Sequence, residues 1–226
     1  IVDSKNHEKL TPKEIIAVSS QVGASKIALE LGYEELRRNY YNFGFTKPIS
    51  INFPSSTFGY MNIKESISDS ELASLGYGYG ITMSPFQIAS AYSVFANSGE
   101  YKDFQLLKNE QVTSRKIISN YAASNVLDAL RKVVKDGTGK AAEIRGFSEG
   151  GKTGTVHKIK NGTGYAEDSY RASFIGITPL SDKSLTIFVS IDEPGLNSYT
   201  GGSVAAPVFA KIAESSLNHL GYFEDE

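Results

Sequence analysis

Gly151-Lys152-Thr153-Gly154-Thr155 is the stretch of this 226-residue sequence that decides the expected fold. The threonines, and the valine after them, favour an extended conformation, which predicts a strand from Gly151 to Ile159. Side chains alternate along a strand, so Lys152 and Gly154 point one way while Thr153 and Thr155 point the other. An ammonium and two hydroxyls suit a carboxylate ligand, and Gly154 lets a ligand approach the backbone. Taken alone, these residues are more typical of an exposed turn or edge strand.

The surrounding sequence predicts a sheet with helices around it. Two further β-rich runs, Tyr170 to Ile177 and Ser184 to Ile191, are joined by residues that favour a hairpin loop. Capping signals and apolar periodicity predict five helices. They begin after Thr11, at Val22 (ending at Leu31), after Ser84, near Asn120 (ending at Asp136) and near Pro207. Helices, three strands and a last helix predict an α/β protein of the α+β type, with an antiparallel sheet.

Composition excludes several classes of protein and of site. The chain is 40% apolar and 21% charged, as in a soluble globular domain. A net charge of −2 provides no basic surplus, so no nucleic-acid partner is expected. The absence of cysteine excludes disulfides, Cys-based zinc sites and a Cys nucleophile. No metal or cofactor is expected, no run approaches the roughly 18 apolar residues of a membrane span, and no signal peptide is visible.

A phosphate-binding loop is a competing interpretation of the same region. Residues Gly146 to Thr153 match G-x-x-x-x-G-K-[ST]. Such a loop needs a buried strand before it and a helix after it, because the helix N-terminus holds the phosphate. Lys140 to Arg145 is a poor buried strand, and Gly154 to Val156 is a poor helix start. Nucleotide binding is therefore disfavoured.

The triplet Ser19-Ser20-Gln21 lies at a break between two predicted helices. By itself it indicates a polar helix–helix turn. Penicillin-binding proteins and class A β-lactamases carry three motifs in chain order: S-x-x-K, a triplet with a Ser and an amide, and K-T-G. Ser19-Ser20-Gln21 and the later Lys152-Thr153-Gly154 match the second and third of these in order.

The sequence resembles class B penicillin-binding proteins in four spaced segments that agree in order. It covers residues 1 to about 220 and is most similar to the division-specific branch, the septal peptidoglycan transpeptidases. The segments are Ser19–Lys26 (S-S-N-V-G-x-S-K in the family), Gly76–Gly78 with Ser84–Ala89 (G-Y-G…T-P-x-Q-[LI]-A), Gly151–Thr155 (K-T-G-T) and Tyr199–Gly202 with Ala205–Phe209 (Y-x-G-G…A-P-x-F).

This resemblance implies a penicillin-binding-protein/β-lactamase-like transpeptidase fold, with residues 1–226 as the C-terminal portion of the domain. It implies an enzyme that attacks stem peptides ending in D-Ala-D-Ala, passes the acyl group to an amine of a neighbouring strand, and is acylated by β-lactams. Ser19, Gln21 and Lys152 are then catalytic, whereas Thr153, Gly154 and Thr155 bind substrate. The backbone N–H of Thr155 is expected to donate to the oxyanion.

Two departures from the family pattern matter. No lysine has a serine three residues before it, so S-x-x-K, which supplies the family's nucleophile, is not in this sequence. With Ile1 as the first residue, we expect the nucleophile in an upstream part that is absent here, and the fragment alone to be inactive. The family's Asn is Gln21 in this chain, whose longer side chain makes its role less secure than that of Ser19.

The resemblance also implies a location and partners. Members lie on the periplasmic face of the bacterial inner membrane, anchored by an N-terminal helix that this sequence does not contain, and work with divisome membrane proteins. Two other functions stay open: a D,D-carboxypeptidase using water as acceptor, and a non-catalytic module that binds wall peptide or a divisome partner. A Ser-His-Asp triad is disfavoured, because no G-x-S-x-G elbow accompanies the three histidines, which are His7, His157 and His219.

Overall fold

The computed structural model describes residues 1–222, apart from residues 4, 49–58, 62–63, 109–110, 160–163, 182 and 196, and for residues 165–167 only the backbone. The chain divides into two compact units. Ile1–Ile15 and Ser19–Ser124 form the first, here the helical unit. Ile16–Val18 and Asn125–Glu226 form the second, here the sheet unit.

The helical unit is built from short helices and a small two-stranded sheet. Ser25, buried on α2, donates from its hydroxyl to the carbonyl of Ala73 on α4, which ties the two helices together. β1 and β2 pair antiparallel. The elements are α1 (Pro12–Val18, whose end belongs to the sheet unit), α2 (Gln21–Leu31), α3 (Tyr33–Asn42), α4 (Asp69–Leu75), α5 (Pro85–Ala96), β1 (Glu100–Lys102) and β2 (Ser114–Lys116).

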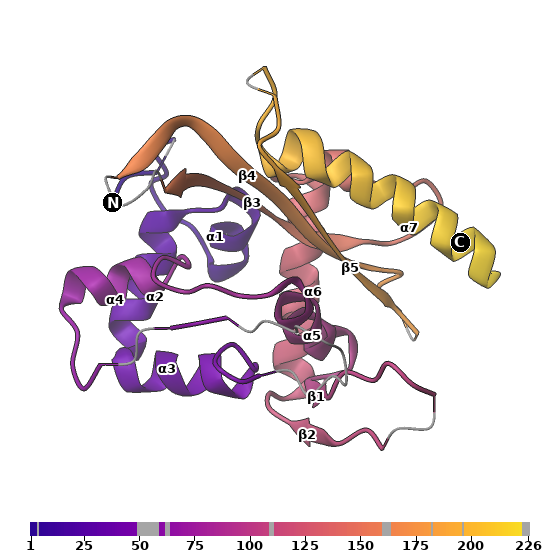
Figure 1. Ribbon diagram of the computed structural model, residues 1–226, viewed down its shortest axis with the longest axis horizontal. Coiled ribbons are helices and arrows are strands. Elements are labelled where there is room, and N and C mark those ends of the chain that lie inside the picture. Colours follow the sequence, from indigo (N-terminus) through magenta and orange to yellow (C-terminus); the bar gives the residue numbers. More distant parts are fainter. Residues whose placement is uncertain are drawn as a thin grey trace. The chain divides into compact units, whose positions relative to one another are not determined.

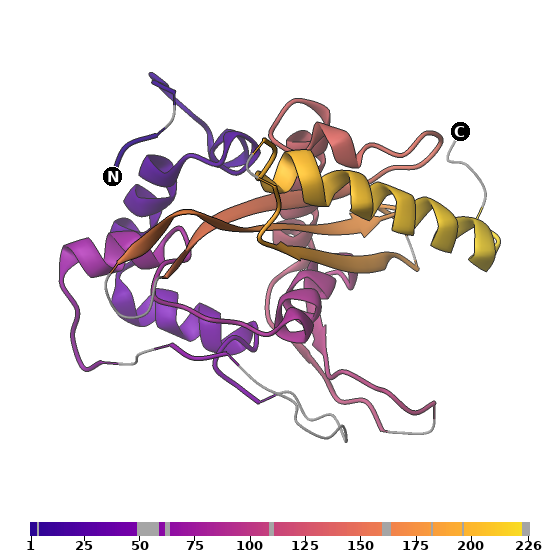
Figure 2. The ribbon, with the colours of Figure 1, turned by 45° about the horizontal axis from the view of Figure 1, so that its top comes forward.

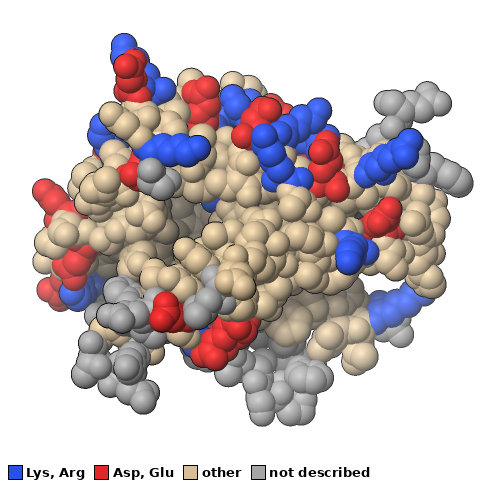
Figure 3. All heavy atoms as spheres, turned by 90° about the horizontal axis from the view of Figure 1, so that it is seen from above, with Lys and Arg blue, Asp and Glu red and all other residues tan. Residues whose placement is uncertain are grey.

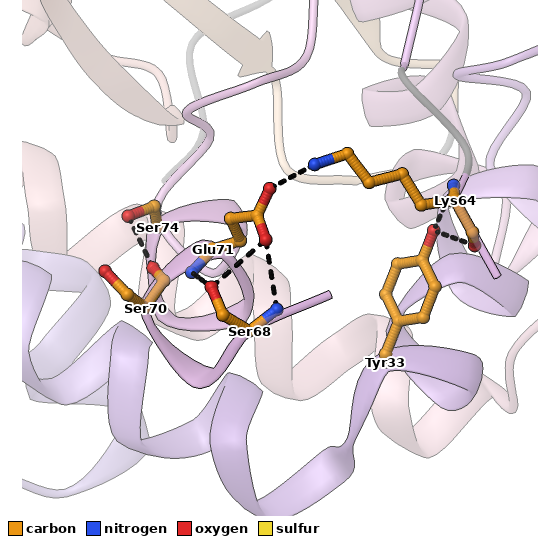
Figure 4. Close-up of polar contacts among 6 residues, drawn as sticks. All are labelled: Tyr33, Lys64, Ser68, Ser70, Glu71 and Ser74. Atoms are coloured by element: carbon orange, nitrogen blue, oxygen red, sulfur yellow. Dashed lines mark hydrogen bonds and ion pairs between the residues drawn. The ribbon is translucent and has the colours of Figure 1, made fainter. Parts of the chain in front are cut away.

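The start of α4 is stabilised by a capping box (Figure 4). Glu71 accepts hydrogen bonds from the N–H and hydroxyl of Ser68, whose own hydroxyl accepts from the N–H of Glu71. Lys64 forms an ion pair with the same carboxylate, and the Tyr33 hydroxyl of α3 bridges the backbone N–H and carbonyl of Lys64. These contacts hold the segment that contains Lys64 between α3 and α4.

Gln87 of α5 is a buried polar hub of the helical unit. Its side-chain amide donates to the carbonyls of Gly44, Phe45 and Lys47, and its oxygen accepts from the N–H groups of Gly59 and Ser84. One fully buried side chain therefore satisfies backbone groups of three loops, as buried polar groups require.

The sheet unit contains one antiparallel sheet and the helix that packs on it (Figures 1 and 2). The strand order is β3-β4-β5, so β3 and β5 are its edges, and α7 contacts β4 and β5. The elements are α6 (Asn120–Lys135, whose first five residues belong to the helical unit), the 3₁₀ turn η1 (Lys140–Ala142), β3 (Gly150–Ile159), β4 (Tyr165–Thr178), β5 (Leu185–Asp192), the π-helical turn η2 (Gly201–Ala205) and α7 (Ala206–Leu220).

The core of the sheet unit lies between the sheet and α7. Phe174 of β4 and Phe209 of α7 are fully buried, and their ring centroids are 4.9 Å apart. A Cβ on Gly176 would lie 2.4 Å from the Phe209 ring, so only glycine lets that ring lie on the sheet. The other buried members of this core are Val134, Ala142, Ile144, Val189, Ala205, Ala206 and Ala213.

The fold confirms the antiparallel sheet and the five helices expected from the sequence, each with bounds within a few residues. It adds elements that were not expected, α3, α4, β1 and β2, and begins β4 five residues earlier, at Tyr165. It excludes the phosphate-binding loop, because Lys152 and Thr153 lie within the strand β3 (Gly150–Ile159), where such a loop would begin a helix. None of the described helices has the length and apolarity needed to cross a bilayer.

Candidate functional site

β3 presents its backbone at a sheet edge. It pairs with β4, Lys152 opposite Ile175 and Thr155 opposite Ala172, and among the described residues no strand pairs with its other edge. The Glu193 N–H donates to the Tyr170 carbonyl, so Tyr170 and every second residue after it on β4 bond to β5. The residues between these on β4, such as Ser173, bond instead to their partners on β3, such as Gly154. Thr155 is the next residue on β3, so its N–H points away from β4, which is the direction that an oxyanion donor requires.

Lys152 is half-buried on β3. Burial lowers the pKa of its ammonium to about 8, because a charge is less stable away from water. Its Nζ donates to the carbonyl of Thr153 at 3.1 Å. At pH 7 Lys152 is therefore a cation, with a pKa close enough to neutrality for its charge to be lost in mildly alkaline solution.

Thr153 and Thr155 each have a polar contact in the sheet unit. Thr138, on the loop between α6 and η1, places its Oγ1 2.7 Å from Oγ1 of Thr153. The N–H of Gly201, at the start of η2, donates to Oγ1 of Thr155 at 3.0 Å. Both hydroxyls are therefore oriented by neighbouring segments of the same unit.

The space beside Gly154 is filled on two sides by this chain. A Cβ on Gly154 would lie 2.5 Å from Oγ of Ser173, its neighbour on β4. A Cβ on Gly201 would lie 2.5 Å from the Gly154 carbonyl oxygen and 2.2 Å from that of Ser173. Gly201 thus allows η2 to pack directly on the backbone of β3 and β4, whereas Gly154 leaves room for the Ser173 hydroxyl.

A buried ion pair holds the residue before β3. Glu149 is fully buried and pairs with Arg131 of α6, which also donates to the backbone carbonyl of Glu149 at 3.0 Å. The second carboxylate oxygen accepts the N–H of Ile144 at 3.3 Å. Burial raises the pKa of Glu149, while the Arg131 guanidinium and these hydrogen bonds counter that rise. β3 is therefore anchored to α6 three residues before Lys152.

Ser19 occupies the junction between α1 and α2. Its φ of 59° is in the left-handed region, which costs a non-glycine residue about 1–3 kcal/mol and is concentrated at functional sites. The next residue, Ser20, is buried and caps α2, its hydroxyl accepting the N–H of Gly23 at 2.9 Å. Ser19 is half-buried, so of the two serines Ser20 is the structural one and Ser19 the candidate for chemistry.

Asp3 provides a second cap for α2. It accepts the Ser20 hydroxyl and, at 3.1 Å, the N–H of Val22. Burial acts to raise the pKa of Asp3, but the hydrogen bonds from Ser20, Val22 and Gln21 outweigh that effect and lower it. The carboxylate therefore fixes the residues that directly follow Ser19.

The predicted site residues are divided between the units. Ser19 and Gln21, the first residue of α2 and exposed, belong to the helical unit. Lys152, Thr153, Gly154 and Thr155 belong to the sheet unit, where they follow one another along β3. Each cluster is organised within its own unit, and their assembly into one site stays a prediction.

Other ligand classes find little support in the described part of the chain. No three His, Asp or Glu side chains gather there as a metal-binding group. On the face shown in Figure 3, basic and acidic side chains are interspersed rather than segregated by sign. His157 lies on β3 with its ring 4.5 Å, centroid to centroid, from that of Tyr170.

Sequence analysis did not identify Asp3, Thr138 or Glu149 as parts of these clusters. Asp3 is far from α2 in sequence, and Thr138 lies in a loop whose contacts depend on how α6 meets the sheet. Glu149 is acidic and is followed by two glycines, a pattern typical of an exposed loop. Their contacts arise from tertiary packing, which periodicity does not report.

The chain is similar to known proteins in both sequence and fold. The family described as penicillin binding protein transpeptidase domain matches residues 1–214. The probable peptidoglycan D,D-transpeptidase PbpC of Pseudomonas aeruginosa is 36% identical over 222 residues, 97% of this chain but 39% of that protein. The chain thus spans about two fifths of the length of this curated relative.

Two solved structures share the fold. The apo transpeptidase domain of Burkholderia pseudomallei penicillin-binding protein 3 superposes with a TM-score of 0.91 at 33% identity, covering 100% of this chain and 69% of that one. Penicillin-binding protein 3 of Mycobacterium tuberculosis, solved in complex with aztreonam, gives 0.87 at 25% identity, covering 100% of this chain and 55% of that one. The chain belongs to the penicillin-binding protein transpeptidase domain family.

Proposed function

We propose that the protein containing this chain is a serine-type peptidoglycan D,D-transpeptidase that cross-links stem peptides ending in D-Ala-D-Ala. The observation that carries the proposal is the outer edge of β3, with which no strand of the described residues pairs. There Lys152 supplies a cation, Thr153 and Thr155 supply oriented hydroxyls, and the Thr155 N–H points away from β4. This is the set of groups needed for a terminal carboxylate and a developing oxyanion.

The roles follow from the chemistry of each group. Thr153 and Thr155 donate hydrogen bonds to the carboxylate of the stem peptide or of a β-lactam, and Lys152 supplies positive potential for that carboxylate. Thr155 N–H donates to the carbonyl oxygen as it becomes an oxyanion, a contribution of roughly 3 kcal/mol. Ser19, beside Gln21, relays a proton to the leaving amine, which adds roughly 10²–10⁴-fold to the rate. The nucleophile is the serine of an S-x-x-K motif located outside these 226 residues.

The finer assignment is to the division septum, on the periplasmic face of the inner membrane and with divisome membrane proteins as partners. It is supported by the four motif segments, which are most similar to those of the septal branch. The β-lactam assignment is supported by the Mycobacterium tuberculosis relative, which was solved with aztreonam.

Replacement of Lys152 tests the carboxylate role. One charge-assisted hydrogen bond is worth about 1.5–3 kcal/mol, so Lys152→Ala in the full-length protein should slow acylation by a fluorescent penicillin about 10- to 100-fold. The wild-type rate should also decrease as the pH rises through about 8, where Lys152 loses its proton. Melting temperature serves as the control, and parallel losses of rate and melting temperature would make Lys152 structural.

Covalent labelling tests the assignment of the nucleophile. The 226-residue chain should take up no fluorescent penicillin, whereas the full-length protein should be labelled and should lose the label when the serine of its S-x-x-K motif becomes alanine. Incubation with a D-Ala-D-Ala peptide and an amine acceptor then separates cross-linking from hydrolysis. Labelling of the 226-residue chain alone would contradict this assignment and direct attention to Ser19.

A further inference from the structure

The hydroxyls of Thr153 and Thr155 differ in how their protons are directed. A threonine hydroxyl has one proton to donate and two lone pairs that accept. Oγ1 of Thr155 accepts the N–H of Gly201, so its proton remains available to a ligand. Oγ1 of Thr153 lies 2.7 Å from Oγ1 of Thr138, a hydrogen bond in which either hydroxyl can donate to the other.

An anionic ligand decides the direction of that bond. A carboxylate accepts hydrogen bonds and has none to donate, so Thr153 must point its proton at the ligand. Thr138 must then donate to Thr153. A hydroxyl that accepts one hydrogen bond becomes a stronger donor of the next, and the bond to a charged oxygen is the stronger of the two.

The surroundings hold Thr138 in place for this task. A Cβ on Gly202 would lie 2.3 Å from the carbonyl oxygen of Thr138 and 3.6 Å from the Thr153 methyl carbon. The Gly202 backbone therefore packs against both threonines. The N–H of Gly139, the residue after Thr138, donates to the carbonyl of Val133 at 2.9 Å, which closes the loop onto α6. The Thr138 side chain itself is exposed, so its hydroxyl contributes little to the core.

We propose that Thr138 is a positioning residue for the substrate carboxylate and acts through Thr153. Its hydroxyl donates to Oγ1 of Thr153, which turns the Thr153 proton toward the carboxylate. Thr153 and Thr155 then present two protons to the ligand, each from a hydroxyl that accepts a bond from its own unit. This inference rests on the proposed transpeptidase function.

A double-mutant cycle on the full-length protein tests it. The variants are Thr138→Val, which removes the hydroxyl and keeps the shape, Thr138→Ser, which keeps the hydroxyl, Thr153→Val, and the Thr138→Val/Thr153→Val double variant. The measured quantities are the second-order rate constant for acylation by a fluorescent penicillin and the melting temperature. We expect Thr138→Val to slow acylation about tenfold, the size of one net hydrogen bond, and Thr138→Ser to stay close to wild type.

The cycle separates positioning from a structural effect. In the Thr153→Val background, Thr138→Val should change the rate less than twofold, because the group through which it acts is gone. An unchanged rate in Thr138→Val, or an equal loss in both backgrounds, would overturn the inference and leave the transpeptidase function standing. A loss of rate in step with melting temperature, unrescued by serine, would also overturn it. A wild-type protein that takes no label would overturn the function and this inference together.

Discussion

The junction around Ser19 and the strand around Lys152 are held in place by different kinds of interaction. Around Ser19 the supports are hydrogen bonds that the first turn of α2 donates, from the N–H of Gly23 to the Ser20 hydroxyl and from the N–H of Val22 to the Asp3 carboxylate. Around Lys152 the supports are close packing, with Gly201 against the backbone of β3 and β4, and a buried ion pair between Glu149 and Arg131.

This difference sets how each segment should respond to change. A helix cap at a partly exposed site, including one made by a solvent-screened carboxylate, is worth about 1 kcal/mol, so the loss of one is tolerated. A buried charge without its partner, or a methyl group forced into a backbone contact, costs about 1–5 kcal/mol. The junction should therefore be the tolerant segment and the strand the intolerant one.

The largest expected effect is at the anchor of β3. Arg131→Met leaves the Glu149 carboxylate buried without its cation, which should lower the free energy of unfolding by about 3–5 kcal/mol. Burial raises the pKa of Glu149, and Arg131 opposes that rise, so the variant has a still higher pKa. The Arg131→Met variant should therefore keep its stability at acid pH and lose it as the pH rises through the folded-state pKa of Glu149.

Urea denaturation followed by circular dichroism, at pH 5 and pH 7.5, measures this effect. The loss should be larger at pH 7.5. The Arg131→Met/Glu149→Leu double variant is the control, and it should recover most of the stability because no buried charge remains. A loss that is equal at both pH values and persists in the double variant would show that Arg131 contributes by packing alone.

A smaller effect is expected where η2 meets the sheet. Gly201→Ala places a methyl group 2.2 Å from the carbonyl oxygen of Ser173 and 2.5 Å from that of Gly154, and both are backbone atoms that move only with their strands. We expect a loss of about 2–3 kcal/mol and slower penicillin acylation. Gly195→Ala is the matched control, since no atom lies within 4 Å of its Cβ, and it should match wild type. If Gly201→Ala were as stable as wild type, η2 would have moved away from the sheet at little cost in free energy.

The smallest effect is expected at the junction. Asp3→Ala removes one of the two caps of α2 and should cost about 1 kcal/mol or less. Because hydrogen bonds lower the pKa of Asp3 in the folded state, the wild-type advantage exists above the unfolded-state value and disappears as the pH falls through the folded-state pKa. Urea denaturation at pH 7 and pH 3 measures the difference in free energy of unfolding between wild type and Asp3→Ala, and Asp3→Asn is the conservative control. A loss as large as that of Arg131→Met would contradict the contrast between the two segments.

Much of the fold was predictable because its elements carry local signals. Thr11 with Glu14, and Ser84 with Pro85, mark helix starts that the structure confirms through capping bonds. α3 has apolar side chains at helical spacing, Tyr33, Leu36 and Tyr40, but it was missed because most of its residues are strongly polar and none is buried. α4 did carry a signal, the capping box of Ser68 and Glu71, but its seven residues are too few for a periodic pattern.

The candidate site was predictable to the same extent and for a similar reason. The order of Ser19-Ser20-Gln21 and Lys152-Thr153-Gly154 is a pattern along the chain, so the sequence by itself determined the family and predicted these residues as the site. The β-rich runs determined the antiparallel sheet. Alternation along a strand also determined that Thr153 and Thr155 share a face.

Only the tertiary structure decided what surrounds them. The burial of Glu149 against Arg131, the approach of Gly201 to Gly154 and the contact of Thr138 with Thr153 join residues that are 15 or more positions apart. Such contacts depend on how strands and helices pack in three dimensions, and packing leaves no period in the sequence. The residue types of the candidate site are therefore a local property of the sequence, whereas the orientation of the threonine hydroxyls and the lowered pKa of Lys152 are set by distant parts of the chain.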